Sequence, residues 1–303
     1  MLQPLSTGTT PSTAPVGILL VATSAIVWSF GGAIARFLVV EESWTIVFWR
    51  AAWAVVFLLS FLILRDGFRG TIKIFRDMGL PGVGVALCFA TASTTFILAL
   101  SYTTVANILL IQAGVPLFAA LFAWLLFSER VATETWLAIA AVILGVTVMV
   151  SESLNSRISP IGNLLALLIT FAFALATVLT RRYSSVRMTP AACLGMTASA
   201  CVSAVLANDL STTAPGMGLL FIFGALNLGL GLALFTSGVR LVPAAIAALI
   251  GVLETVLGPL WVWLMHSEIP TTATLTGGAI VLFALISHLS WQCRHQRRVV
   301  DFL

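Results

Sequence analysis

A single acidic residue stands inside an otherwise apolar run, LIGVLETVLGPLWVWL, at residues 249–264. If this run crosses a lipid bilayer as a helix, the Glu254 carboxylate lies near the centre of the hydrocarbon. A charge there costs roughly 2.5–3.5 kcal/mol, and such residues face a polar interior instead of lipid. Three roles are open to Glu254: carrying a proton, attracting an ammonium group, or hydrogen-bonding a neighbouring helix.

Other polar and aromatic side chains fall inside apolar runs and are candidates to line the same interior. The polar candidates are Thr94, Tyr102, Asn107, Gln112 and Asn227. The aromatic candidates are Trp28, Phe173 and Trp263, and the candidates for bending or gating a helix are Pro116, Gly258 and Pro259. For each of them, packing between helices is the competing interpretation.

Residue types needed for covalent or metal chemistry are scarce and scattered. His266, His288 and His295 lie near the ends of apolar runs or after the last one, and no HExxH motif occurs. The four cysteines show no CxxC spacing, and Glu254 has no second acid at its depth. We therefore predict no metal, no cofactor and no enzymatic activity.

Cations are also missing from the middle of the runs. The only lysine, Lys73, lies in a loop, and Arg36 and Arg50 lie near the outer ends of the first two runs. A cavity without cations is unsuited to phosphates or nucleotide sugars. The predicted substrate is a small neutral or zwitterionic molecule, or a lipophilic cation, and the net charge of +4 calls for no nucleic acid.

These residues must be positioned by membrane-spanning helices. The chain of 303 residues is 60% hydrophobic and 9% charged, against about 45–50% and 25% in soluble domains. Ten apolar runs are long enough to cross about 30 Å of hydrocarbon as helices. They start near Val16, Trp44, Gly79, Thr104, Glu134, Pro160, Met188, Gly216, Pro243 and Thr271. We predict an all-α integral membrane protein with ten transmembrane helices.

Basic residues divide unevenly between the two ends of these helices. If both termini are cytoplasmic, 12 of the 15 lysines and arginines fall on the inner side, as the positive-inside rule requires. We predict an N-in and C-in protein of the bacterial inner membrane, surrounded by the lipid bilayer. The alternative, a removed leader of residues 1–35, conflicts with the lack of Lys or Arg before the first run.

An internal repeat divides the chain into two units of five helices. A shift of 139 residues superposes Trp124, Ser128 and Glu129 on Trp263, Ser267 and Glu268, and a shift of 145 superposes Pro15, Gly17 and Arg36 on Pro160, Gly162 and Arg181. Because five is odd, the second unit is inverted, and such repeats build secondary transporters with a site near the midplane. The shift of 145 also pairs Trp28 with Phe173 across the pseudo-twofold axis.

The predicted domains follow from this repeat. They are a cytoplasmic leader over 1–15, a first five-helix repeat over 16–151, a second over 160–291, and a basic cytoplasmic tail over 292–303. The stretch Gly277-Gly278 fits either packing within the chain or a contact between two copies, so the oligomeric state is open.

Several short patterns resemble the drug/metabolite transporter superfamily, in its ten-span EamA type. They are Trp28-Ser29-Phe30 in the first run, Pro116, Glu129-Arg130 and Gly145 in and after the fourth, and Glu254, Pro259 and Glu268 in and after the ninth. The similarity covers nearly all of residues 16–290. Thr255 stands where relatives have a proline after the glutamate, which leaves open where the ninth helix bends.

The resemblance implies a secondary transporter that exports small neutral or zwitterionic metabolites, or eases their passage, by alternating access. Aromatic amino acids are the leading substrate, since the chain resembles the bacterial exporters of those amino acids, and protons are a candidate coupling partner. Two alternatives are a multidrug transporter for lipophilic cations and a receptor or assembly subunit that moves nothing.

Overall fold

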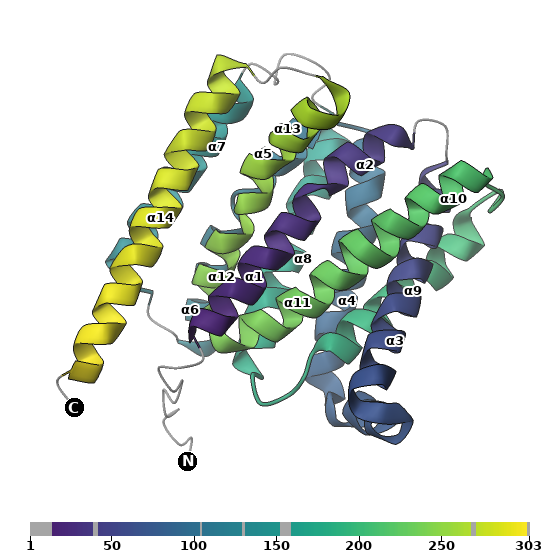
Figure 1. The fold of residues 1–303 in the computed structure, drawn as a ribbon, viewed down its shortest axis with the longest axis horizontal. Helices are drawn as coiled ribbons and strands as arrows, with labels where there is room; N and C mark the ends of the chain where they lie inside the picture. Colours follow the sequence, from purple (N-terminus) through teal and green to yellow (C-terminus); the bar gives the residue numbers. More distant parts are fainter. Residues whose placement is uncertain are drawn as a thin grey trace.

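The computed structural model describes residues 14–38, 42–103, 105–128, 131–151, 159–267 and 271–301. Over these residues every regular element is a helix, as Figure 1 shows. The elements are α1 Ala14–Ser29, α2 Gly31–Phe37, α3 Ser43–Asp77, α4 Gly79–Leu100, α5 Val105–Gln112, α6 Val115–Phe127, α7 Thr133–Val150, α8 Pro160–Arg182, α9 Thr189–Leu206, α10 Ala214–Phe221, the π-helix η2 Ile222–Gly229, α11 Leu230–Gly238, the 3-10 turn η3 Val239–Leu241, α12 Ala244–Gly251, α13 Leu253–His266 and α14 Thr272–Asp301. The predicted all-α membrane fold is confirmed in this part of the chain.

The described residues contain nine helical segments long and apolar enough to span a membrane. A shorter apolar helix, Thr133–Met149, occupies the place of the fifth predicted run. The first helix starts and the last one ends at the same end of the bundle (Figure 1). Glu129-Arg130, Arg157, Glu268 and the leader before residue 14 lie outside the described residues.

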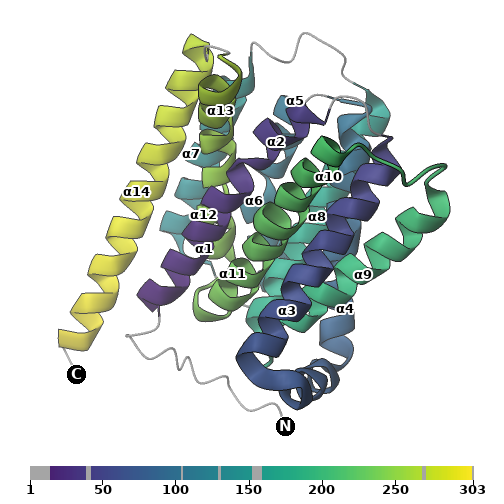
Figure 2. The same ribbon diagram turned by 45° about the vertical axis from the view of Figure 1, so that its right-hand side comes forward.

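The helix α3 bends sharply near its end, at Gly67. This glycine has φ 70° and ψ 169°, a conformation that side chains with a Cβ rarely adopt. The chain after Gly67 therefore leaves the direction of α3, and the short return is visible at the base of the bundle in Figure 2. Asp66 accepts a hydrogen bond from Arg187 at 2.6 Å, which ties this bend to the start of the segment leading into α9.

Four of the spanning segments are interrupted. The first breaks between α1 and α2 at Phe30, the fourth between α5 and α6 at Ala113-Gly114, and the ninth between α12 and α13 at Val252. The eighth changes from α-helix to π-helix over η2. In the ninth segment the interruption therefore precedes Gly258 and Pro259, which lie inside α13.

Pro116 follows its break directly, in the first turn of α6. A proline is tolerated there because the first turn of a helix has no intrahelical partner for its backbone N–H groups. Pro116 therefore lies next to the break without removing a hydrogen bond from α6.

Corresponding positions of the two sequence repeats share local geometry. Ser128 and Ser267 both end a helix with a left-handed backbone, at φ 55° and 56°. The shift of 139 that superposes these serines also superposes the break at Ala113 on the break at Val252. The fourth and ninth segments are thus built alike.

The close contacts of two glycines match in the same way. A Cβ on Gly17 would lie 2.6 Å from the Leu241 Cβ, and a Cβ on Gly162 would lie 2.6 Å from the Thr103 Cβ. Gly17 therefore brings α1 against the end of the eighth segment, and Gly162 brings α8 against the end of the third. Each half of the chain packs its first helix on the third helix of the other half.

The helices α7 and α14 approach each other through glycine. A Cβ on Gly277 would lie 2.6 Å from the Met149 Cα and closer still to the Gly145 carbonyl oxygen. Gly278 faces Val256 of α13. Both glycines of the Gly277-Gly278 pair thus contact helices of their own chain, as small residues do where membrane helices cross closely.

A cavity between the two halves as the candidate functional site

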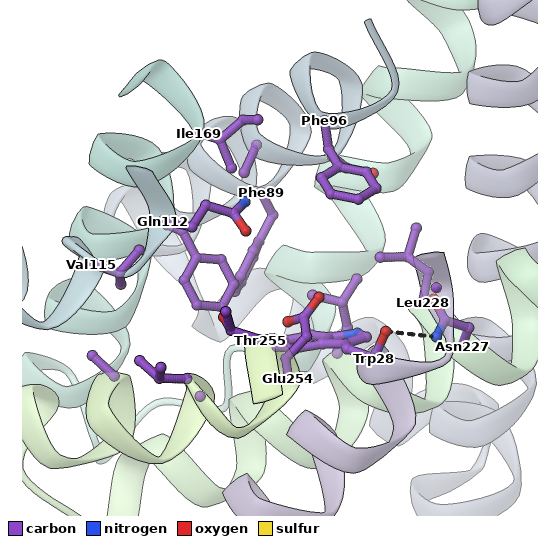
Figure 3. Close-up of a pocket in the computed structure, with 18 of the residues that line it drawn as sticks. Trp28, Phe89, Phe96, Gln112, Val115, Ile169, Asn227, Leu228, Glu254 and Thr255 are labelled. Atoms are coloured by element: carbon purple, nitrogen blue, oxygen red, sulfur yellow. Dashed lines mark hydrogen bonds between the residues drawn. The ribbon is translucent and has the colours of Figure 1, made fainter. Parts of the chain in front are cut away.

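Residues from both halves of the chain line one cavity in the middle of the bundle (Figure 3). Of the predicted candidates, Trp28, Gln112, Phe173, Asn227 and Glu254 lie on its wall. The first two come from the first repeat and the last three from the second. The five candidates, which are far apart in sequence, thus meet in one place.

Two of the helix breaks supply much of this wall. Gln112 and Val115 flank the break between α5 and α6, and Gly251 and Glu254 lie on either side of the break at Val252 between α12 and α13. At a break the backbone turns, so side chains that an unbroken helix would spread over different faces converge. Substrate sites of many secondary transporters are formed by interrupted helices of this kind.

Glu254 projects into the cavity that Gln112 also lines, as Figure 3 shows. Within the described ranges its carboxylate forms no hydrogen bond and no ion pair shorter than 4.0 Å. The charge is tolerated because it faces this interior space instead of lipid.

Arg50 of α3 lines the same cavity, which corrects the expectation that the interior lacks a cation. The residue is only 7% exposed, because it lies two turns inside α3 and on the face that packs against the bundle. By sequence position Arg50 lies near the outer end of its run, where Glu41 and Glu42 are close enough along the chain to pair with it. Glu42 instead accepts a hydrogen bond from the Asn208 side chain at 2.8 Å.

Two phenylalanine rings hold the Arg50 guanidinium. Its carbon lies 4.4 Å from the centre of the Phe223 ring and 5.5 Å from that of Phe96, distances suited to cation–π attraction. One nitrogen, Nη1, donates to the Ser93 hydroxyl at 3.3 Å, while Nε has no partner in the described chain. Arg50 and Glu254 influence each other electrostatically without forming a direct ion pair.

Aromatic rings form one side of the cavity. The predicted pair Trp28 and Phe173 is in contact, edge to face, with ring centres 5.7 Å apart. Phe89 also lines the cavity and lies edge-on to Phe173 at 6.3 Å. Gly231 of α11 makes room for the Trp28 indole, because a Cβ there would lie 2.5 Å from the Trp28 Cδ1. The cavity therefore offers a flat apolar surface beside its charged groups.

Asn227 joins the π-helix η2 to the end of α1. Its Nδ2 donates to the Val27 carbonyl at 2.6 Å and to the Trp28 carbonyl at 3.3 Å, the latter drawn in Figure 3. The carbonyl groups at the end of a helix have no partner within the helix. Asn227 thus fixes the backbone that carries Trp28, and the π-helix brings its amide within reach.

Four predicted cavity residues lie elsewhere. Thr94 shares a hydrogen bond with Ser199 of α9 at 2.7 Å. Asn107 donates to Asn163 of α8 at 2.6 Å. Tyr102 and Trp263 are 47% and 42% exposed on the outside of the bundle. The contacts of Thr94 and Asn107 match the packing interpretation that was left open for them, whereas Tyr102 and Trp263 face the surroundings of the bundle.

Aromatic contacts join the first spanning segment to α13. The rings of Phe30 and Trp261 stack with centres 4.1 Å apart, and the Trp261 indole donates to the Ser29 hydroxyl at 2.7 Å. Further along, the rings of Phe37 and His266 lie 4.4 Å apart.

A corresponding contact lies between α6 and α8. The Arg182 guanidinium lies 5.1 Å from the centre of the Phe127 ring. The repeat shifts superpose Phe37 on Arg182 and Phe127 on His266. The two contacts therefore occupy equivalent places in the two halves of the chain.

Among the residues that the structure describes, no three His, Cys, Asp or Glu side chains gather as metal ligands. The described cysteines, Cys88, Cys193 and Cys201, are free thiols.

Comparison with known proteins agrees with this architecture. The chain is 27% identical over 284 residues to the pseudopaline exporter CntI of Pseudomonas aeruginosa, covering 89% of this chain and 95% of that exporter. It is 24% identical over 252 residues to an S-adenosylmethionine uptake transporter of Rickettsia felis, covering 81% and 82% of the two chains. A solved crystal structure shares the fold with a TM-score of 0.75 at 16% identity, over 90% of this chain and 96% of that one.

The sequence also matches a transporter family over both of its halves, at residues 15–151 and 160–289. These ranges include every described residue that lines the cavity. The chain belongs to the EamA-like transporter family.

Proposed function

We propose that this protein is a secondary transporter that passes small zwitterionic metabolites across the membrane by alternating access at the central cavity. The observation that carries the proposal is the presence of both Arg50 and Glu254 on the wall of a cavity that is lined by both halves of the chain. Opposite charges beside an apolar wall suit a molecule with a carboxylate, an ammonium and a large apolar group.

The two halves act as inverted repeats in this proposal, over residues 16–151 and 160–291. The matching breaks at Ala113 and Val252, and the matching left-handed serines, support a common origin for the halves. Five segments per half give the second half the opposite orientation. Alternating access then exchanges the roles of the two halves around a fixed site.

Aromatic amino acids are the first substrates to test. Trp28, Phe89, Phe96 and Phe173 line the cavity, and aromatic rings pack favourably edge-on or offset against one another. Two relatives are named for other cargoes, pseudopaline and S-adenosylmethionine, and one exports while the other takes up. Family membership alone therefore does not fix the direction of transport, which depends also on the substrate gradient across the membrane.

Two alternative functions give different results in the same assays. A multidrug transporter would carry lipophilic cations, which the Arg50 charge in the cavity disfavours. A receptor or assembly subunit would bind a ligand in detergent and give no flux into liposomes.

The proposed setting is the bacterial inner membrane, with both termini on the cytoplasmic side. The basic residues around the bend at Gly67, together with Arg187, lie at the end of the bundle where the first helix starts and the last ends. The positive-inside rule assigns that end to the cytoplasm.

Transport into proteoliposomes tests the proposal. Vesicles preloaded with unlabelled phenylalanine should take up labelled phenylalanine or tryptophan in a saturable counterflow, with and without a pH gradient. Glu254→Gln should reduce this flux at least tenfold, whereas Glu134→Gln, which changes an exposed glutamate of α7, should leave it unchanged. Saturable uptake of lipophilic cations in place of amino acids would contradict the proposal, as would binding without flux.

A further inference from the structure

Arg50 is buried without a full set of partners. A guanidinium has five N–H donors, yet Arg50 uses Nη1 for one hydrogen bond of 3.3 Å and leaves Nε unpaired among the described residues. Burying a charge is costly unless it is paired and hydrogen-bonded. An arginine that served only to hold helices together would be expected to meet more acceptors than this.

The opposite charge that acts on Arg50 is that of Glu254, and the two side chains are not in direct contact. Both side chains line the cavity, but no ion pair of 4.0 Å or less joins them. Buried ion pairs stabilise a protein only with close geometry and further hydrogen bonds. Space is therefore left between two opposite charges, and the Arg50 side chain is held in place by Phe96 and Phe223.

We infer that Arg50 binds the carboxylate of the transported molecule while Glu254 receives its ammonium group, so that the cavity selects amino acids by both charges. This inference rests on the proposed function and names its specificity-determining residue. A planar guanidinium suits a carboxylate because two parallel N–H donors match its two oxygens. A bound zwitterion gives each buried side chain an oppositely charged partner, its carboxylate for Arg50 and its ammonium group for Glu254.

The aromatic wall then determines which amino acids are preferred. Trp28 and Phe89 line the same cavity as the two charges, so a bound amino acid can place its carboxylate and ammonium on the charges and its side chain on the rings. A molecule that lacks the carboxylate leaves Arg50 uncompensated. A molecule that lacks the ammonium leaves Glu254 uncompensated.

Three probes that differ by one group test the inference. They are phenylalanine, phenethylamine, which lacks the carboxylate, and 3-phenylpropionate, which lacks the ammonium. Each is measured as a competitor of labelled phenylalanine, in equilibrium binding to detergent-solubilised protein and in proteoliposome counterflow. The wild type should bind phenylalanine at least tenfold better than either analogue, because each analogue loses one charge-assisted contact.

The variants should then change the order of the probes. Arg50→Gln should weaken the binding of phenylalanine by about tenfold to a hundredfold, and it should bind phenethylamine as tightly as the wild type or more tightly. Arg50→Lys should retain part of the preference for the carboxylate. Glu254→Gln should bind phenylalanine more weakly and 3-phenylpropionate more tightly than the wild type does. Arg76→Gln, which changes an exposed arginine, is the control and should bind all three probes as the wild type does.

Ratios between probes are measured within one preparation, so partial unfolding of a variant does not alter them. An unchanged order of probes in Arg50→Gln, with wild-type flux intact, would overturn the role of Arg50 and leave the proposed transport standing. Binding with the expected order but no counterflow would support the inference and overturn transport. Absence of both binding and flux in folded wild type would overturn both.

Discussion

The crossing of α7 and α14 allows a quantitative test of packing. Replacing Gly277 with alanine adds a Cβ 2.6 Å from the Met149 Cα, and nearer to the Met149 amide nitrogen and the Gly145 oxygen. All three are backbone atoms, so no side chain can rotate away. Ordinary contact at 3.4 Å requires the helices to separate locally by about 0.8 Å at the Met149 Cα and by more at the two closer atoms, and overpacking of this kind costs about 1–3 kcal/mol.

Gly278→Ala is the matched control. Its Cβ would lie 3.4 Å from the Val256 Cγ1, which is ordinary contact with a side chain. Both substitutions gain the same helix propensity, about 1 kcal/mol for alanine over glycine. The difference in stability between the two variants therefore isolates the packing cost at Gly277.

Thermal unfolding in detergent measures this difference. We expect Gly277→Ala to unfold at a lower temperature than Gly278→Ala, and Gly278→Ala to match or exceed the wild type. If Gly277→Ala unfolds at the same temperature as Gly278→Ala or above it, the α7–α14 crossing is looser than described and the reasoning is refuted.

Two further predictions concern the cavity and the repeat. Gly231→Ala should displace the Trp28 indole, because the new Cβ would lie 2.5 Å from its Cδ1. The variant should therefore bind phenylalanine about tenfold more weakly. Gly218→Ala, where no atom lies within 4 Å of the new Cβ, is the control, and equal binding of phenylalanine by both variants would contradict the prediction. Ser128→Gly and Ser267→Gly should each raise stability by up to about 1 kcal/mol, since both serines hold a left-handed backbone, and a loss of thermal stability in either variant would count against it.

Much of the fold could be predicted from the sequence because lipid imposes a simple rule. Runs of about 20 apolar residues must form helices, so the starts of the spans were predictable to within a few residues. The fifth run, Thr133–Met149, is the one that the structure gives as a shorter apolar helix. Glu254 could be assigned to an interior by its cost alone.

The contents of the cavity were harder to predict. Arg50 looked peripheral because its distance along the chain from the start of α3 is short, and the sequence does not say which face of α3 packs inward. The arginine changes the expected chemistry, since the argument against anionic substrates rested on the absence of a cation. Its position among aromatic residues, in the stretch VFWRAAW, is a signal that could have suggested a cation held by rings.

Asn107 and Thr94 show why polar residues inside apolar helices are hard to assign from sequence. Both are polar residues inside apolar helices, as Gln112 and Asn227 are, and composition cannot separate the two kinds. The difference lies in the partner, because Asn107 meets Asn163 and Thr94 meets Ser199 across a helix contact. Hydrogen bonds between distant segments depend on the packing of the whole bundle, which a single sequence leaves open.

The two contacts that the repeat shifts superpose differ in chemistry. One joins the Phe37 ring to the His266 imidazole, and the other joins the Arg182 guanidinium to the Phe127 ring. Under the proposed alternating access, a duplicated chain with identical halves would have two open states of equal energy. If each contact separates in one of those states, one state loses a contact between two rings and the other loses a contact between a cation and a ring. The proposed mechanism therefore predicts two open states that differ in free energy, so that divergence of the duplicated residues gives the protein a preferred resting side.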